Sequence, residues 1–237
     1  MTRDLNTPIT PHHNQKESNS MTEQSTSPAA PIPVSRVTVR PVTSETELHE
    51  HVRRWSEMSG RDPEYTDTLI EFHRQGLLGT GPETLSAAYA GHGLPAAAAT
   101  ATIVLLAAMD GVPVGGVITA PPVGKAVQAI VDSDDSDAGL PELQHTTVVQ
   151  VLSVDPEHRY RGIGTALIQA ALSAAAAMGA RVIVGDFPDD PELTSFFRGA
   201  GLTVPVPGPG VDRTKPADPD LDDAPESGWR VFTQSLT

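Results

Sequence analysis

The amino-acid sequence predicts a mixed α+β (α/β) fold, with a mostly antiparallel central sheet, one parallel strand pair and helices on both faces. Two observations lead to this prediction. The β-rich runs 102–109 and 112–120 flank Asp110-Gly111, the pair typical of a type I′ hairpin. Further along, the apolar run 148–154 leads through a glycine turn and an alanine-rich segment to a second apolar run. A helical crossover of this kind makes its two strands parallel.

The length and composition predict one domain preceded by a tail. The 237 residues can form one sizeable core. Residues 1–35 are polar and contain several prolines, so they cannot bury enough apolar surface to fold. We therefore expect a disordered tail over 1–35 and a single domain over 36–237. No secretory signal is apparent in the tail, and we expect a cytoplasmic protein.

The charge and the residue types exclude several classes of function. Thirty acidic and 16 basic side chains give a formal net charge of −14, which disfavours partners such as nucleic acids and anionic membranes. The absence of cysteine excludes a disulfide scaffold, a thiolate metal site and a cysteine nucleophile. No set of histidines and carboxylates has the spacing of a metal site, so we expect no metal.

The first half of the domain contains clear start signals for its elements. A strand is predicted over 37–42, with Pro41 at an edge. Ser44 and Glu47 form a capping box that begins a helix, and Asp62-Pro63 begins another. A third helix is predicted over 82–90, and the apolar run 94–109 is interpreted as the approach to a buried strand. We expect two flexible loops, acidic over 121–143 and proline-rich over 207–227.

The second half alternates strands and helices. The patterns predict a central strand, a helix that ends at Gly179, a parallel strand, a short helix and two closing strands. In this order the elements span 145–154, 165–177, 181–186, 191–200, 203–206 and 229–233.

The most informative stretch is the turn between the central strand and its helix, which reads Arg159-Tyr160-Arg161-Gly162-Ile163-Gly164. The first turn of a helix has unpaired N–H groups and the positive end of the helix dipole, and glycines let a phosphate approach the backbone. A Rossmann turn is excluded because Leu167 stands where its third glycine would be. A P-loop is excluded because Gly124-Lys125 is followed by alanine.

Two motifs resemble landmarks of the GCN5-related N-acetyltransferase (GNAT) superfamily. Arg159-x-x-Gly162-x-Gly164 resembles its acyl-CoA signature, Gln/Arg-x-x-Gly-x-Gly/Ala, and residues 196–202 resemble its Phe-Tyr-x-x-x-Gly-Phe segment. The resemblance covers residue 35 to the C-terminus, with motif-level detail in 148–202. It implies direct acetyl transfer from acetyl-CoA to the amine of a small molecule or peptide in a ternary complex, and it allows a homodimer.

The resemblance also implies which residues hold acetyl-CoA. The parallel strand pair splays apart, the pantetheine arm pairs with the backbone of the central strand, and the diphosphate lies on the amides of the turn. A backbone N–H near Leu152 and Ser153 would polarise the thioester carbonyl. The implied cofactor-binding residues are Leu152, Ser153, Val154, Arg159, Tyr160, Arg161, Gly162, Ile163, Gly164 and Thr165.

The catalytic groups are less well defined by the sequence. His145, at the start of the central strand, is the candidate general base, with Glu142 and Asp186 as rivals. Phe197 stands where the family usually has a tyrosine that protonates the thiolate. Water, or a hydroxyl such as that of Thr194 or Ser195, could take its place. An alternative function is therefore a degenerate acyl-CoA-binding sensor or scaffold of the same fold.

The acceptor is not identified by any motif. The segment that would line the acceptor site, 43–121, contains none. Acidic loops elsewhere favour cationic acceptors such as polyamines, aminoglycosides or lysine side chains.

Overall fold

The computed structural model describes residues 36–205 and 229–236, and the predicted tail 1–35 and loop 207–227 lie outside this part. Six strands form one sheet in the order β1-β2-β3-β4-β5-β6. Every neighbouring pair is antiparallel except β4 and β5, which are parallel. The predicted fold class is confirmed. The strands are β1 (Val37–Pro41), β2 (Ile103–Met109), β3 (Val112–Ala120), β4 (Thr146–Val154), β5 (Val182–Pro188) and β6 (Trp229–Ser235).

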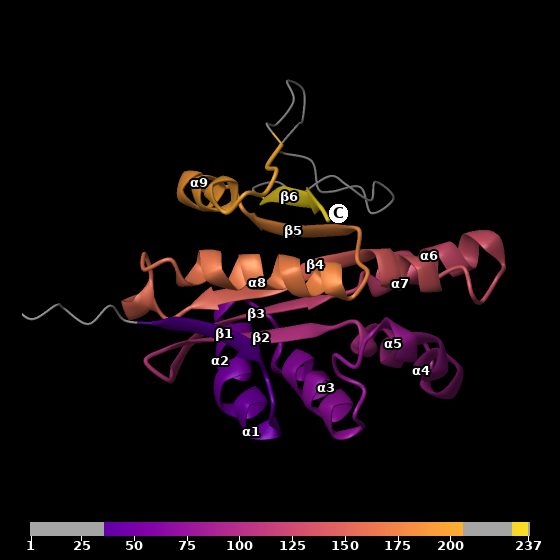
Figure 1. Cartoon of the computed structure of the whole chain (residues 1–237). Coiled ribbons are helices and arrows are strands. Elements are labelled where there is room, and N and C mark those ends of the chain that lie inside the picture. Colours follow the sequence, from indigo (N-terminus) through magenta and orange to yellow (C-terminus); the bar gives the residue numbers. More distant parts are fainter. Residues whose placement is uncertain (1–35, 206–228, 237) are drawn as a thin grey trace, which may run out of the picture. The chain divides into compact units, whose positions relative to one another are not determined.

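Helices cover both faces of the sheet, as Figure 1 shows. The long helix α8 packs on β1 to β4 on one face, and α2 and α3 pack on the other. The helices are α1 (Glu45–Glu47), α2 (Arg53–Met58), α3 (Pro63–Arg74), α4 (Leu85–His92), α5 (Leu94–Thr100), α6 (Val123–Ser133), α7 (Leu140–His145), α8 (Ile163–Ala177) and α9 (Pro191–Gly199). A π-helical turn, Leu48–Val52, joins α1 to α2, and 3-10 turns occupy Pro82–Thr84 and Pro156–His158.

The local start and turn signals of the sequence are confirmed. Asp110 and Gly111 have φ angles of 52° and 86°, as a type I′ hairpin requires. The Ser44 hydroxyl accepts a hydrogen bond from the Glu47 amide at 3.2 Å. Asp62 likewise caps α3 through the Glu64 amide at 3.2 Å. These elements were predictable because each depends on residues within one turn of the chain.

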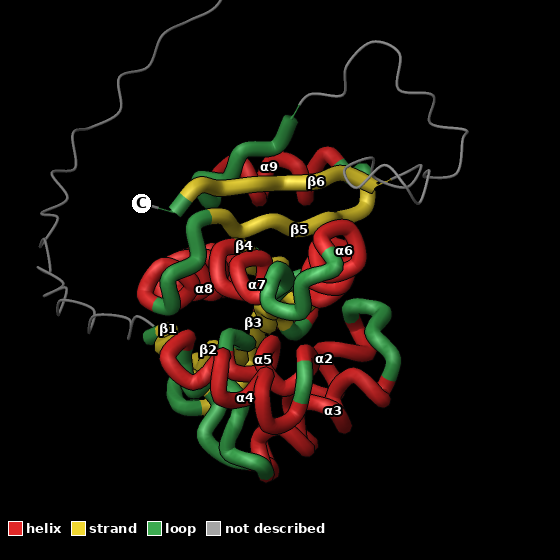
Figure 2. Tube along the Cα trace, turned by 90° about the vertical axis from the view of Figure 1, so that its right-hand side faces the viewer, coloured by secondary structure: helices red, strands yellow, loops and turns green. Residues whose placement is uncertain are grey.

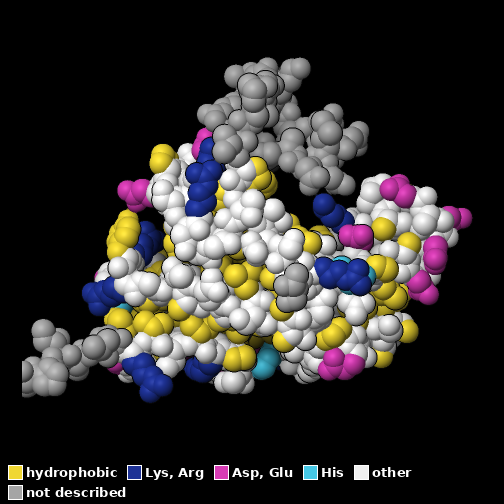
Figure 3. Space-filling model, turned by 45° about the horizontal axis from the view of Figure 1, so that its top comes forward, with side chains coloured by type: hydrophobic (Ala, Val, Ile, Leu, Met, Phe, Trp, Pro, Cys, Tyr) yellow, Lys and Arg dark blue, Asp and Glu magenta, His cyan; other side chains and the backbone are white. Residues whose placement is uncertain are grey.

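The prediction of a flexible loop over 121–143 is wrong, because this segment forms α6 and most of α7. Val123, Ala126, Val127 and Ile130 recur at helical spacing, and α7 has a proline in its first turn. The acidic residues that suggested a loop lie at the exposed junction of the two helices, and Figure 3 shows acidic side chains gathered there. The solvated acidic cluster therefore lies in the short connection between α6 and α7.

Two further element predictions need correction. Residues 94–100 form the helix α5 and not the approach to a strand, because Ala96–Ala99 is a strong helix-forming run that becomes buried. The strand expected over 203–206 is reduced, within the described residues, to a single bridge between Thr203 and Thr233. The central strand begins at Thr146, so His145 is the last residue of α7.

Two adjacent glycines in β3 allow its neighbours to lie close, Gly116 on the side of α2 and Gly115 on the side of β4. A Cβ on Gly116 would lie 2.7 Å from the Trp55 ring, and one on Gly115 would lie 2.7 Å from the Ser153 carbonyl oxygen. Trp55 is only 2% exposed. Gly116 therefore makes room for the indole ring of α2, and Gly115 lets β4 lie close to β3.

We expect Gly116→Ala to lower the free energy of unfolding by about 1–3 kcal/mol, because the new methyl group would overlap the Trp55 ring. Urea denaturation of the full chain measures the change. Gly91→Ala is the matched control, because Gly91 lies in α4 and a methyl group there would meet no atom within 4 Å. This control should be stabilising by up to about 1 kcal/mol. Equal effects of the two variants would contradict the packing argument.

Candidate functional site

The parallel strands β4 and β5 pair over only three positions and then separate. Their register runs from Thr146 opposite Val182 to Val148 opposite Val184. Beyond this point β4 remains paired with β3, and β5 remains paired with β6. The two strands therefore form a fork, which we define as the opening between residues 149–154 of β4 and 185–188 of β5. Figure 2 shows β5 beside β6 at this edge of the sheet.

A β-bulge lies at the base of the fork. In the β3–β4 register Ile118 pairs with Val151 and Thr119 with Val149, which leaves Gln150 without a partner on β3. The extra residue changes the alternation of β4, since Val149 packs in the cluster under α8 while Val151 packs in the cluster under α2 and α3. The bulge thus occurs where β4 turns away from β5.

At the β4–α8 turn begins a helix that no side chain of the described residues caps. Gly162 is the N-cap of α8, has a φ angle of 77° and is exposed. By contrast, Asp62 caps α3 and Asp190 caps α9. A Cβ on Gly162 would have no atom within 4 Å, so the space beside its backbone is open. The first-turn N–H groups of α8 are therefore available to an anion.

The three side chains before this glycine are exposed and include two cations. The Arg159 Nε donates to the Val154 carbonyl at 3.1 Å, which ties the turn to the end of β4. Tyr160 is 93% exposed with a φ angle of 60°, and its hydroxyl donates to a Glu192 carboxylate oxygen at 3.3 Å. In the described part of the chain neither Arg159 nor Arg161 forms an ion pair. Both guanidinium groups can therefore meet a bound anion.

The second glycine of the turn serves a packing purpose. A Cβ on Gly164 would lie 3.1 Å from two ring atoms of Phe196. Gly164 therefore brings α9 close to the first turn of α8. Ile163, between the two glycines, is buried in the core, while Thr165 is exposed beside the turn.

The opposite side of β4 is fixed by α2. The buried Asp155 carboxylate accepts from the Trp55 indole nitrogen at 2.9 Å and pairs with Arg54. The Ser153 hydroxyl donates to the Trp55 carbonyl at 3.1 Å and lies 2.7 Å from the Ser59 hydroxyl. These contacts join residues about a hundred positions apart, and no sequence motif indicated them. They hold the end of β4 against a helix and so restrict movement of the turn.

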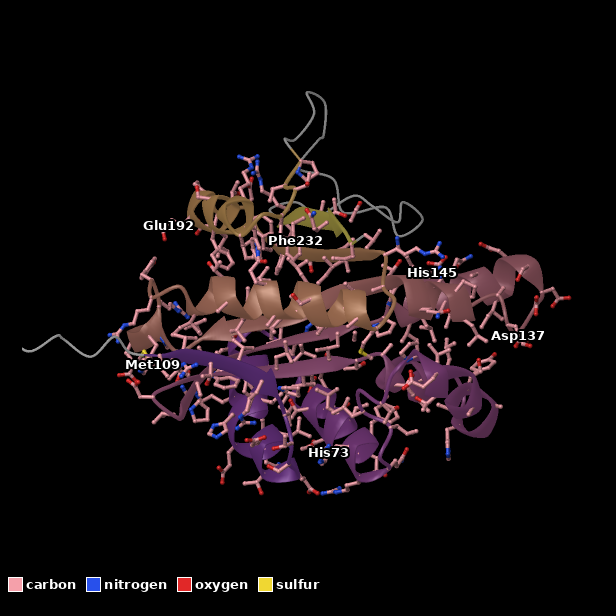
Figure 4. The ribbon with its side chains drawn as sticks, in the orientation of Figure 1. His73, Met109, Asp137, His145, Glu192 and Phe232 are labelled. Carbon is pink, nitrogen blue, oxygen red and sulfur yellow. The ribbon has the colours of Figure 1, made fainter. Side chains whose placement is uncertain are left out.

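The structure does not bring His145 together with the glycine turn. β4 has nine residues between them, which corresponds to roughly 25–30 Å. Figure 4 shows His145 at the α7 end of the sheet and Glu192, the Tyr160 partner, at the opposite end. Glu142 lies in α7 as well, whereas Asp186 is exposed on the β5 arm of the fork. Of these three candidate bases, only Asp186 lies on the fork.

Phe197 lies in the core and not at the surface of the fork. It is 5% exposed, and its ring centroid is 4.5 Å from that of Phe232 and 4.6 Å from that of Phe187. A tyrosine here would bury its hydroxyl among aromatic rings. The Ser195 hydroxyl donates to the Pro191 carbonyl at 2.8 Å, and the Thr194 hydroxyl accepts from Arg230 at 3.1 Å.

Membrane spans and metal clusters are both absent from the described residues. In residues 36–205 and 229–236, no helix has the length and apolar character needed to cross a bilayer. The same residues contain no group of three or more histidines and carboxylates that could hold a metal ion.

Solved structures of similar fold come from several organisms. The structure of yncA from Salmonella typhimurium, solved with acetyl-CoA, is 15% identical, with a TM-score of 0.51 and coverage of 86% of this chain and 95% of that one. A GNAT-family structure from Desulfovibrio desulfuricans is 16% identical, with a TM-score of 0.49 and coverage of 85% and 100%. Ard1 from Thermoplasma volcanium is 15% identical, with a TM-score of 0.48 and coverage of 85% and 98%. These likenesses concern the fold.

The family comparison rests on the sequence itself. Among curated proteins no relative was found. The model of the acetyltransferase (GNAT) family matches residues 82–202, about half of the chain, and this match includes the hairpin, the fork and the glycine turn. The chain therefore belongs to the GNAT acetyltransferase family and is an acetyltransferase that uses acetyl-CoA.

Proposed function

We propose that this protein is an N-acetyltransferase that transfers the acetyl group of acetyl-CoA directly to an amine within a ternary complex. The observation that carries the proposal is the fork between β4 and β5, which opens next to the uncapped first turn of α8. An anionic cofactor and a second substrate can meet there without a covalent enzyme intermediate. The absence of cysteine from the chain agrees with direct transfer.

The diphosphate of acetyl-CoA binds at the β4–α8 turn in this proposal. The amides from Arg161 to Thr165 supply hydrogen-bond donors and the positive end of the α8 dipole. The guanidinium groups of Arg159 and Arg161 add charge, and Tyr160 covers the turn from the solvent side. The open space beside Gly162 supports this role, because a side chain there would occupy the place of the anion.

The pantetheine arm and the thioester bind along the free edge of β4. Beyond Val148 no strand of the described residues pairs with this edge, so backbone groups of Leu152, Ser153 and Val154 are available for hydrogen bonds. A backbone N–H at Leu152 or Ser153 would stabilise the negative charge that develops on the thioester oxygen. The contacts of Ser153 with α2 keep this edge in place during the reaction.

We assign the deprotonation of the amine to Asp186, directly or through one water molecule. The last β4–β5 pair joins Val148 to Val184, so two residues further along each strand Asp186 stands opposite Gln150 across the fork. Its carboxylate is exposed and lies on the sheet face opposite α8, because Ile183 and Phe187 face the α8 cluster. Water protonates the departing thiolate, because the Phe197 side chain cannot.

Thiol release from acetyl-CoA, measured with a panel of small amines and peptides, tests the proposed function. We expect release that depends on the amine, together with a mass increase of one acetyl group on the acceptor. Tight acetyl-CoA binding without release for any amine would instead favour a binding protein of the same fold.

We expect Gly162→Asp to weaken acetyl-CoA binding more than Gly162→Asn does. Both side chains have nearly the same size and both tolerate the left-handed backbone of this position, so the difference isolates the charge. We expect the dissociation constant of the Asp variant to exceed that of the Asn variant by about 10-fold at low salt, with a smaller ratio at high salt. Isothermal titration calorimetry provides the measurement. Equal constants would contradict the placement of the diphosphate.

The candidate bases can be separated by their effect on turnover. We expect Asp186→Asn to lower kcat by about 100-fold or more while leaving acetyl-CoA affinity unchanged. His145→Gln is the matched comparison and should leave kcat within about two-fold, because His145 lies outside the fork. Steady-state thiol release gives both values. A large loss of kcat in the His145 variant alone would reverse the assignment.

A further inference from the structure

The loop after α2 holds an arginine in a fixed position beside the fork. Gly60 has a φ angle of 76°, the Gly60 amide donates to Glu57 and the Arg61 amide donates to Ser56, each at 2.9 Å. This is the hydrogen-bond pattern of a Schellman motif, which ends α2 in a defined conformation. The backbone of Arg61 is therefore rigid, and its side chain leaves the helix end in one direction.

The Arg61 side chain is held against β4 at the bulge. Its Nε donates to the Gln150 carbonyl at 3.0 Å, and its guanidinium carbon lies 5.9 Å from the centroid of the Tyr65 ring. Burial raises the pKa of the Tyr65 hydroxyl to about 12, so this neighbour stays neutral. The contact with Gln150 uses one N–H of the guanidinium group. Four further N–H donors remain on its terminal nitrogens.

Arg61 forms no ion pair with a carboxylate of the described residues, although its side chain is half-buried beside β4. Within residues 36–205 and 229–236, ion pairs to carboxylates are formed by Arg40, Arg53, Arg54, Arg74 and Arg230. None of these ion pairs includes Arg61, although the chain has 30 acidic residues. A half-buried cation without a carboxylate can bind the anionic group of a ligand.

Asp186 provides the complementary charge on the other side of the fork. Asp186 lies two residues beyond the last β4–β5 pair on β5, and Gln150, which Arg61 contacts, lies two residues beyond it on β4. Both side chains lie on the α2 face of the sheet. The opening therefore has a cation on its β4 side and an anion on its β5 side.

We propose that the acceptor is an amine that also carries a carboxylate, such as a free α-amino acid, with its carboxylate on Arg61 and its ammonium group toward Asp186. This inference rests on the proposed N-acetyltransfer and adds the class of acceptor. It differs from the cationic acceptors that the acidic composition favours, because the charges beside the fork decide what binds there. Arg61 acts as a specificity-determining residue.

Kinetics with α-amino acids and the matching α-amides test the inference, because amidation removes only the negative charge. At saturating acetyl-CoA we expect wild-type kcat/KM for the free acid to exceed that for the amide by about 10- to 100-fold. Arg61→Gln should abolish this preference, mainly by raising KM for the free acid. Arg181→Gln is the control, because it removes an exposed arginine that precedes β5, away from the fork, and should keep the preference.

Two results would overturn the inference. One is equal use of acids and amides by the wild-type chain. The other is a variant Arg61→Gln that loses kcat/KM equally for the acid and the amide and also binds acetyl-CoA more weakly. Arg61 would then only support the bulge.

If no amine is acetylated, the proposed N-acetyltransfer is wrong. The carboxylate site at Arg61 is then tested by ligand binding alone. Calorimetry then compares N-acetyl amino acids with their amides on the CoA-bound chain. Selective binding of the acid that is lost in Arg61→Gln supports the site. Absence of selective binding overturns it.

Discussion

The end of pairing between β4 and β5 is the feature on which the rest of the site depends. A parallel ladder that continued past Val148 and Val184 would satisfy both strand edges and leave no room for a substrate. Instead, the pairing stops two residues before the bulge at Gln150, while β3 still holds the other edge of β4. The exposed edge of β4 then has backbone donors and acceptors that a ligand can use. The proposed ligand-binding edge therefore exists because the pairing of β4 with β5 ends early.

An open strand edge is useful only if it is held in place, and α2 performs this task. Trp55 inserts over Gly116, donates to Asp155 and accepts from Ser153, so a single residue connects β3, β4 and the start of the turn. The loop that follows α2 contacts the bulge through Arg61. The helix α2 and its loop therefore fix the β4 edge proposed to bind the thioester and the Arg61 side chain proposed to bind the acceptor. This arrangement preorganises the two substrates relative to each other.

The sequence was informative where a feature depends on neighbouring residues. The hairpin at Asp110-Gly111, the caps at Ser44 and Asp62 and the glycine turn at Gly162 all follow from local rules. The bulge at Gln150 could not be predicted, because it is defined only by the register with β3. The position of Arg61 beside the fork was hidden for the same reason, whereas Asp186 could be named as a candidate base because it ends the predicted parallel strand 181–186. His145 attracted attention as a titratable residue, but strand length separates it from the turn.

The net charge of −14 shows why local geometry must govern binding in this domain. Acetyl-CoA is an anion, and an acidic protein repels it at long range. At physiological ionic strength, however, charges are screened over about 8 Å, so distant carboxylates contribute little at the turn. The groups of the turn that can attract an anion are the amides of α8, Arg159 and Arg161, beside the acidic Glu157 and Glu192. The same reasoning applies on the acceptor side, where no carboxylate of the described residues forms an ion pair with Arg61. A chain that is acidic overall can therefore bind anions at a fork where cations and helix amides are the groups placed to meet them.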